Sequence, residues 1–202
     1  MSRTLCDLCG LHTRLCVCDA CLPVANQTAI TILQHPSEVG RAKGTVRVLA
    51  QCLQSCRICI GESPVELARG GVDTDSLGSG VGLLFPGPDS RPLESAPPSD
   101  IKHWIVLDGT WRKAAKLVHL NPALKTLPSY HLVAPPPSRY IIRKAPGPGY
   151  LATAEAVAHL LATMEPGLDT TPIDHAMKVL VQRLLAQVPA SLRHRYGSRE
   201  EG

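Results

Sequence analysis

The sequence predicts an α/β protein, a sheet with helices on both of its faces, preceded by a small cysteine-rich knuckle. Short apolar stretches of strand character alternate along the chain with stretches of helical periodicity, which is typical of a helix-covered sheet. Five of the eight cysteines lie between Cys6 and Cys21. A segment this short cannot build a core of its own, so we expect a metal to fold it. We therefore assign residues 1–24 to the knuckle and residues 25–202 to the main domain.

The first half of the main domain is expected to contain three strands and one helix. Residues 28–34 are β-branched and apolar, end before a proline, and predict a buried strand. The apolar spacing of residues 45–53 suits a short helix, and residues 57–60 resemble a second strand. Residues 61–80 carry glycines, aspartates and serines, so we expect a loop there. Residues 81–85 form the third strand.

The second half is expected to add two strands and three helices. Residues 104–107 are an apolar strand, and residues 112–118 form a helix that ends before an Asn-Pro pair. Residues 139–144 are predicted to form a strand with basic flanks. Residues 154–165 form a helix with one apolar face. The last helix begins near Thr171, where a capping residue, a first-turn proline and a first-turn acid follow one another.

Composition and charge limit the class of protein. The chain is 44% hydrophobic and 19% charged, as in a folded protein, and carries a formal net charge of +4. This charge permits a polyanionic partner without requiring one. No window approaches the roughly 18 apolar residues of a membrane span, and the N-terminus lacks an apolar signal region. We therefore expect a cytoplasmic protein with no membrane partner and with reduced thiols.

The cysteine cluster has the spacing of a zinc site. Two pairs with short spacing supply thiolates to a single small loop, and zinc prefers four such ligands in a tetrahedron. We expect Cys6, Cys9, Cys16 and Cys18 to bind the ion, with Cys21 as the alternative to Cys18. Four protein ligands leave no open position for a substrate, so the zinc is expected to be structural.

A polar constellation follows the strand over residues 104–107. Ligands in open α/β sheets collect beyond the carboxyl ends of the strands, and Asp108 stands at such an end. Gly109 permits a tight turn, Thr110 can cap the next helix or bond a ligand, and Trp111 offers a flat apolar wall. Taken alone, these residues fit a ligand site and an ordinary helix start with a core tryptophan equally well.

Asp108-x-Thr110-Trp111 resembles the signature that gives the DTW-domain family its name. Further segments resemble family motifs in the same order, after the early cysteines: residues 33–38, 43–45, 84–86, 121–124, 143–146 and 151–156. Two positions depart from the pattern, since Gly44 stands where asparagine is expected and Ala152 where serine is usual. The resemblance covers the chain from Cys6 to Ala156.

The resemblance implies a fold and a reaction. The family is similar to the SPOUT class, α/β proteins with a knotted cofactor-binding region, so a knot toward the C-terminal end is expected. Members are aminocarboxypropyltransferases, which move the 3-amino-3-carboxypropyl group of S-adenosylmethionine to N3 of a uridine and release methylthioadenosine. Asp108 is then the candidate to accept the N3 proton or to orient N3.

Matching motif positions implies contacts to S-adenosylmethionine. Trp111 is expected to pack on the methionine portion, Thr45 to bond the ribose, and the backbone at Leu84 to receive the adenine. Thr153 is expected to hold the methionine carboxylate, because helix N-termini favour anions. That threonine also fits a plain helix cap. Thr110 completes the set through its hydroxyl.

Basic residues flank the proposed site and are expected to contact RNA. Each cluster alone fits a solvated surface, but all of them lie beside the site motifs in the sequence. They are Arg41, Lys43 and Arg47, then Arg112 and Lys113, then Arg139, Arg143 and Lys144. His35 either joins the site or only ends a strand. The oligomeric state stays open, with a monomer slightly favoured.

Three alternatives compete with this interpretation. A SPOUT-type RNA methyltransferase would use the same cofactor but leave S-adenosylhomocysteine. Ribosomal RNA could replace transfer RNA, although the cysteine knuckle resembles the transfer-RNA branch. A zinc-knuckle RNA-binding module without catalysis would need no Asp108-x-Thr110-Trp111 motif at a strand end.

Overall fold

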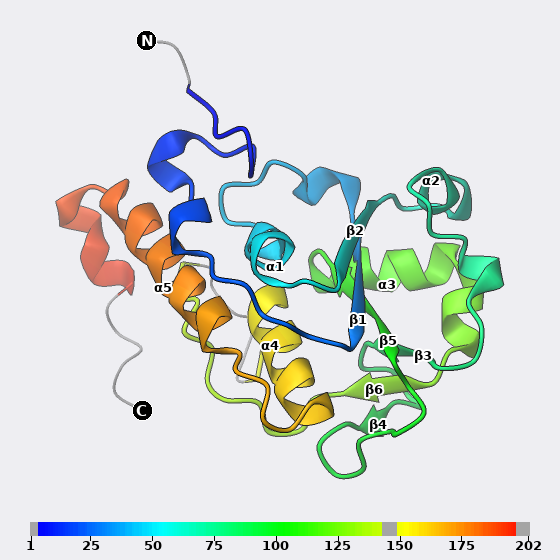
Figure 1. Ribbon diagram of the computed structural model, residues 1–202. Coiled ribbons are helices and arrows are strands. Elements are labelled where there is room, and N and C mark those ends of the chain that lie inside the picture. The colour runs from blue at the N-terminus through cyan, green and yellow to red at the C-terminus, as the bar shows by residue number, and fades with distance from the viewer. Residues whose placement is uncertain (1–3, 143–148, 197–202) are drawn as a thin grey trace.

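The computed structural model describes residues 4–142 and 149–196 (Figure 1). Within them, six strands form one sheet in the order β2-β1-β5-β3-β6-β4, and every neighbouring pair is parallel. The strands are β1 (Ala29–Gln34), β2 (Cys56–Ile60), β3 (Val81–Leu84), β4 (Arg91–Pro92), β5 (His103–Asp108) and β6 (Ser129–His131). Because all six strands run in the same direction, their carboxyl ends lie at one edge of the sheet.

Helices cover both faces of this sheet, as the sequence predicted. They are α1 (Val46–Cys52), α2 (Pro64–Arg69), α3 (Trp111–Leu120), α4 (Thr153–Met164) and α5 (Thr171–Ala186). Figure 1 shows α1, α4 and α5 on one side of the sheet and α2 and α3 on the other. A large hydrophobic cluster lies under α1, α4 and α5, and a smaller one lies under α2.

The alternation along the central strands determines which face each side chain takes. On β1, Ile32 belongs to the larger cluster and Leu33 to the smaller one, and on β5 Val106 belongs to the larger. Since side chains alternate with a period of two, Gln34 and Asp108 point to the α1 and α4 face at the carboxyl edge. The register pairs these two residues directly.

Four of the predicted strands and the predicted helices are confirmed, but the loop expected over residues 61–80 is partly wrong. Helix α2 lies within it and begins at a complete capping box. The side chain of Ser63 accepts from the backbone of Glu66, whose carboxylate accepts in return from the backbone of Ser63. Pro64 at the first helical position adds a further start signal.

The strand expected over residues 139–144 is also wrong within the described residues 139–142. The backbone N–H groups of Arg139 and Tyr140 donate to the carboxylate of Glu155, at 2.7 and 3.1 Å, instead of to a neighbouring strand. A side chain on α4 therefore satisfies the donors that a sheet would have used. The sheet instead gains two strands that were not predicted, β4 and β6, both earlier in the chain.

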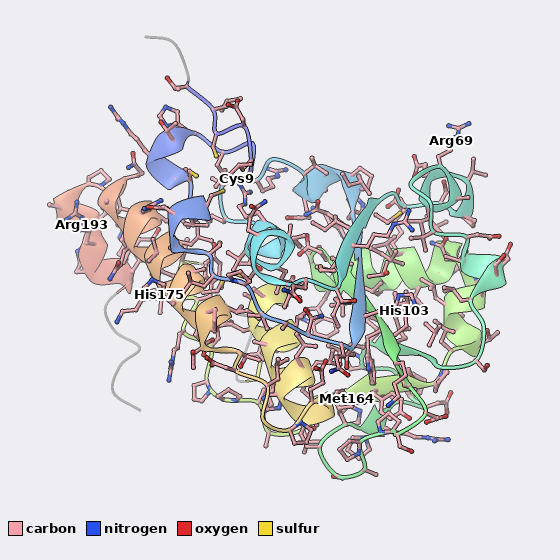
Figure 2. The ribbon with its side chains drawn as sticks, viewed as in Figure 1. Cys9, Arg69, His103, Met164, His175 and Arg193 are labelled. Carbon is pink, nitrogen blue, oxygen red and sulfur yellow. The ribbon has the colours of Figure 1, made fainter. Side chains whose placement is uncertain are left out.

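The knuckle packs on the main domain. Val17 is fully buried in the larger cluster, and the backbone of Val24 donates to the carbonyl of Cys52 at 2.7 Å. Arg183 on α5 donates from two nitrogens to the two oxygens of Asp19. In Figure 2 the labelled Cys9 lies beside α1. No helix in the described ranges is long and apolar enough to cross a membrane.

Candidate functional site

Four thiols of the knuckle converge. The sulfur atoms of Cys6, Cys9, Cys16 and Cys18 all lie within 4.8 Å of one another, and those of Cys6 and Cys18 are 3.9 Å apart. A tetrahedral zinc site with Zn–S bonds of about 2.3 Å has S···S edges of about 3.8 Å. Gly10, with φ of +67°, turns the chain directly after Cys9. The cysteines selected by spacing are the ones that the fold gathers, and they fit a tetrahedral metal ion.

The fifth cysteine of the knuckle has a different partner. Hydrogen bonding to the Cys52 thiol and burial raise the pKa of Cys21, and the same contact lowers the pKa of Cys52. Cys21 is not part of the convergent group, so the structure favours Cys18 as the fourth ligand. The backbone amide of Cys9 is the main cause that lowers the pKa of Cys6 to about 7.

Asp108 is held at the carboxyl edge of the sheet by two side chains. The Gln34 amide donates to Oδ2 at 2.8 Å, and the Thr153 hydroxyl donates to Oδ1 at 2.6 Å. The carboxylate is only 6% exposed. Hydrogen bonds to an ionised acceptor are stronger than neutral ones, so both contacts fix its orientation. Gln34 was not identified from the sequence as a site residue, because its partner depends on the register of β1 with β5.

Thr45, the N-cap of α1, is buried, and Arg47 lies in the first turn of α1. The Thr45 hydroxyl accepts from the backbone amide of Ala154 at 3.2 Å and thereby joins the start of α1 to the start of α4. Arg47 is half-buried and donates to the carbonyls of Gly44 and Arg41. Burial lowers the pKa of Arg47, while the charge of Asp108 is among those that oppose the shift.

A cavity of about 280 Å³ opens next to Asp108, beyond the ends of β3 and β6. Its lining includes Leu84, Phe85, Trp111, Tyr150, Thr153 and Ala156. Five residues were predicted to contact the cofactor. Three of them, Leu84, Trp111 and Thr153, line this cavity. Thr45 and Thr110 are not in the lining. Thr110 is exposed at the N-cap of α3 and makes no capping hydrogen bond with its side chain.

Three of the chain's seven aromatic side chains form one wall of this cavity. The ring centroids of Phe85 and Trp111 are 6.0 Å apart, and those of Trp111 and Tyr150 are 5.5 Å apart with perpendicular planes. Neither Phe85 nor Tyr150 was identified from the sequence as a site residue. The available signals were the place of Phe85 directly after Leu84 and that of Tyr150 three residues before Thr153.

Apart from Arg47, which is half-buried, the predicted RNA-binding residues divide into three groups. Arg41, Arg112 and Arg139 are exposed at the protein surface. Lys43 is exposed but donates to the carbonyl of Ile142 at 3.2 Å, and Lys113 forms an ion pair of 2.6 Å with Glu38. Arg143 and Lys144 lie outside the described residues. Nε2 of the His35 ring hydrogen-bonds a carboxylate oxygen of Glu62 at 2.8 Å, and Nδ1 accepts from the backbone of Ser37.

Comparisons with known proteins identify a domain family and several relatives. The model of the DTW domain matches residues 3–185. A relative from Drosophila melanogaster named tRNA-uridine aminocarboxypropyltransferase 2 is 34% identical over 81% of this chain and 67% of its own length. Proteins of the same name from Mus musculus and Macaca fascicularis are 33% and 29% identical over 81% and 95% of this chain.

The chain spans 57% to 67% of the length of these three relatives. No solved structure matches it significantly. The family match extends over nearly the whole chain, from the cysteine knuckle through the Asp108 edge and into α5. This chain belongs to the DTW domain family.

Proposed function

We propose that this chain is a tRNA-uridine aminocarboxypropyltransferase that moves the 3-amino-3-carboxypropyl group of S-adenosylmethionine to N3 of a uridine. Membership of the DTW family and the names of the three relatives support the reaction class. One structural observation carries the proposal. Thr153 lines the cavity and also donates a hydrogen bond to Asp108. A single side chain therefore connects the proposed S-adenosylmethionine site to a buried carboxylate.

The cavity has the character that the donor requires. Its volume of about 280 Å³ is near the lower end of the range of small-molecule sites, roughly 300–1,000 Å³, and its walls are largely apolar. The Trp111 ring offers a π-face to a sulfonium cation. Thr153 is the first residue of α4, where the helix dipole favours the methionine carboxylate. The backbone at Leu84, at the end of β3, is left to receive the adenine.

Thr45 and Thr110 act indirectly in this proposal. Thr45 holds the backbone of Ala154 and thereby fixes the start of α4. Thr110 is the N-cap of α3 and directly precedes Trp111, which lines the cavity. Both residues set the shape of the donor site without lining it.

Asp108 is the proposed acceptor of the uridine N3 proton. When bound, S-adenosylmethionine supplies an electrophilic γ-carbon and a sulfonium leaving group. The contribution of the chain is to align N3 with that carbon and to remove its proton. Each carboxylate oxygen carries two lone pairs, so Asp108 can accept from N3–H while it keeps its bonds to Gln34 and Thr153.

The remaining parts of the proposal concern the partner and the knuckle. Exposed Arg41, Arg112 and Arg139, and Lys43 beside them, are proposed to contact tRNA phosphates. Zinc is proposed for the four-thiol cluster, with the knuckle over residues 1–24 as a module folded by the metal. We also propose a SPOUT-like knot toward the C-terminal end. The proposed location is the cytoplasm, where thiols stay reduced.

The donor by-product tests the reaction class. A tRNA transcript and S-adenosylmethionine are incubated with the protein, and the nucleosides released from the donor are separated by chromatography. We expect methylthioadenosine, formed only when tRNA is present. Formation of S-adenosylhomocysteine instead would place the protein among the RNA methyltransferases and overturn the proposed transfer.

A further inference from the structure

Two aromatic rings at the cavity remain accessible to solvent. Trp111 is 46% exposed and Tyr150 is 37% exposed. Large apolar side chains that stay exposed side by side at the mouth of a pocket mark a binding surface. Tyr150 is therefore available to a molecule that approaches from outside the donor cavity.

The two rings hold different positions in the aromatic wall. Trp111 contacts Phe85 as well as Tyr150, so it lies between two other rings. In the described part of the chain, the ring contact of Tyr150 is with Trp111 alone. Because the two planes are perpendicular, the edge of one ring meets the face of the other, which leaves ring surface of Tyr150 uncovered.

Hydrogen bonds hold the backbone that follows Tyr150. Gly149 precedes it with φ of +77°, a left-handed conformation that favours glycine. Two residues after Tyr150, the backbone of Ala152 donates to Glu155 at 2.8 Å. The same carboxylate accepts from the Ser138 hydroxyl at 2.8 Å and so ties this segment to the chain before it. The ring is thus presented by a braced segment of the chain.

Tyr150 lies within reach of the reacting groups. Thr153, three residues further on, donates to Asp108 at 2.6 Å. Three residues of extended chain span at most about 11 Å, which limits the separation of the Tyr150 and Thr153 backbones. A planar base that stacks on the tyrosine ring can therefore direct one edge toward the aspartate.

We infer that Tyr150 is the stacking surface for the target uracil base, a role that rests on the proposed function. Stacking on an aromatic ring positions a base without identifying it, because every base has a π-face. Identity then comes from Asp108, since a carboxylate can accept from the N3–H of uracil but not from the unprotonated N3 of cytosine. Arg112, next to Trp111, and Arg139 supply exposed cations for the flanking phosphates.

Substitution of the ring tests this role. Initial rates are measured at saturating S-adenosylmethionine over a range of tRNA concentrations for Tyr150→Phe, Tyr150→Leu and Tyr150→Ala, and donor affinity is measured by calorimetry. We expect Tyr150→Phe to stay within about threefold of the native protein, because the ring remains. The other two variants should lose on the order of tenfold to a hundredfold in kcat/KM for tRNA, the range of one lost base stack. Tyr150 also lines the cavity, so donor affinity should fall as well, but by less than kcat/KM for tRNA.

Val65→Ala is the matched control, because Val65 is an exposed apolar residue on α2 and lies outside the cavity lining. Its kcat/KM should equal that of the native protein. If Tyr150→Leu keeps the native kcat/KM for tRNA, the inference is wrong. A tenfold weaker donor affinity with unchanged use of tRNA would assign the ring to the donor site and would also overturn it.

A crosslinking experiment separates this inference from the proposed function. A tRNA transcript containing 5-iodouridine is irradiated with the protein, and the crosslinked peptide is mapped. We expect the crosslink at Tyr150 and its loss in Tyr150→Leu. Absence of any transfer product from the native protein would contradict the proposed reaction, while a crosslink that maps elsewhere would contradict the stacking role.

Discussion

The metal cluster and the ligand cavity are assembled in opposite ways. The four thiols come from 13 consecutive residues, Cys6 to Cys18, and one local turn at Gly10 helps to gather them. The cavity draws its walls from segments up to 72 residues apart, between Leu84 and Ala156. A site made by one local loop can be recognised from spacing, whereas a site made by several segments needs the strand order before its members can be named.

The largest effect is expected at the cavity edge, from Asp108→Asn. This substitution keeps the shape of the side chain and removes the carboxylate, so the turnover number should fall by about 10²- to 10⁴-fold, the usual contribution of a general base. Donor affinity should be retained because Asp108 is not in the cavity lining. The measurement is single-turnover transfer to tRNA together with calorimetry of donor binding. Near-native turnover would remove Asp108 from the chemistry.

Asp108→Ala distinguishes the structural role of the carboxylate from its chemical role. It leaves the buried amide of Gln34 without its acceptor, which costs about 1–3 kcal/mol of stability. Thermal unfolding should therefore separate the two variants, with the alanine protein less stable and the asparagine protein close to native. Equal melting temperatures would show that the bond from Gln34 contributes nothing to the fold.

The second effect concerns the knuckle. Replacement of both Cys6 and Cys9 by serine should release the metal, because two of four ligands are lost, and should lower the melting temperature. Elemental analysis should find about one zinc per native chain and almost none in the variant. Cys56→Ser, outside the cluster, is the control and should keep its metal. Unchanged metal content in the double variant would contradict the four-thiol site.

Thr153→Val tests the link between cavity and carboxylate. It keeps the shape of the side chain and removes a hydrogen bond to a charged group, which contributes about 1.5–3 kcal/mol. We expect a loss of on the order of tenfold to a hundredfold in kcat/KM. Thr163→Val on the same helix, where the hydroxyl donates only to the carbonyl of His159, should leave activity unchanged. Equal activities of the two variants would show that the link to Asp108 has no role.

The smallest effect is expected where the knuckle meets α5. Arg183→Gln removes an exposed ion pair with Asp19, which contributes about 0.2–1 kcal/mol. Arg183 holds the pKa of Asp19 below its ordinary value of 3.8. This stability is present above that value and is lost as pH falls through the lower folded pKa. Unfolding curves of variant and native protein should therefore differ slightly at pH 7 and converge in acid, and a gap that persists in acid would contradict this cause.

Much of the fold could be predicted from the sequence because it follows from local periodicity. The apolar strands β1, β3 and β5 form the centre of the sheet, where burial on both faces gives the strongest pattern. Helix α2 was missed although its capping box was visible between Ser63 and Glu66. The strand expected near Tyr140 failed because the Glu155 carboxylate satisfies its backbone donors, which no local pattern reveals.

Part of the candidate site could also be predicted from the sequence. The four cysteines followed from spacing. Asp108 followed from the resemblance of its motif to the DTW signature, because its place at the end of an apolar strand fitted a helix start equally well. Gln34 depends on the pairing of β1 with β5, and the contact of Tyr150 with Trp111 depends on where the chain returns before α4. Both are long-range consequences of the fold, so the sequence alone did not identify them.

Mass spectrometry of nucleosides from tRNA tests the central claim most directly. Unmodified tRNA is incubated with S-adenosylmethionine and either the native protein or Asp108→Asn, and is then digested to nucleosides. The account predicts a uridine heavier by one 3-amino-3-carboxypropyl group with the native protein and almost none with the variant. A methylated nucleoside, or the same yield from both proteins, would contradict it.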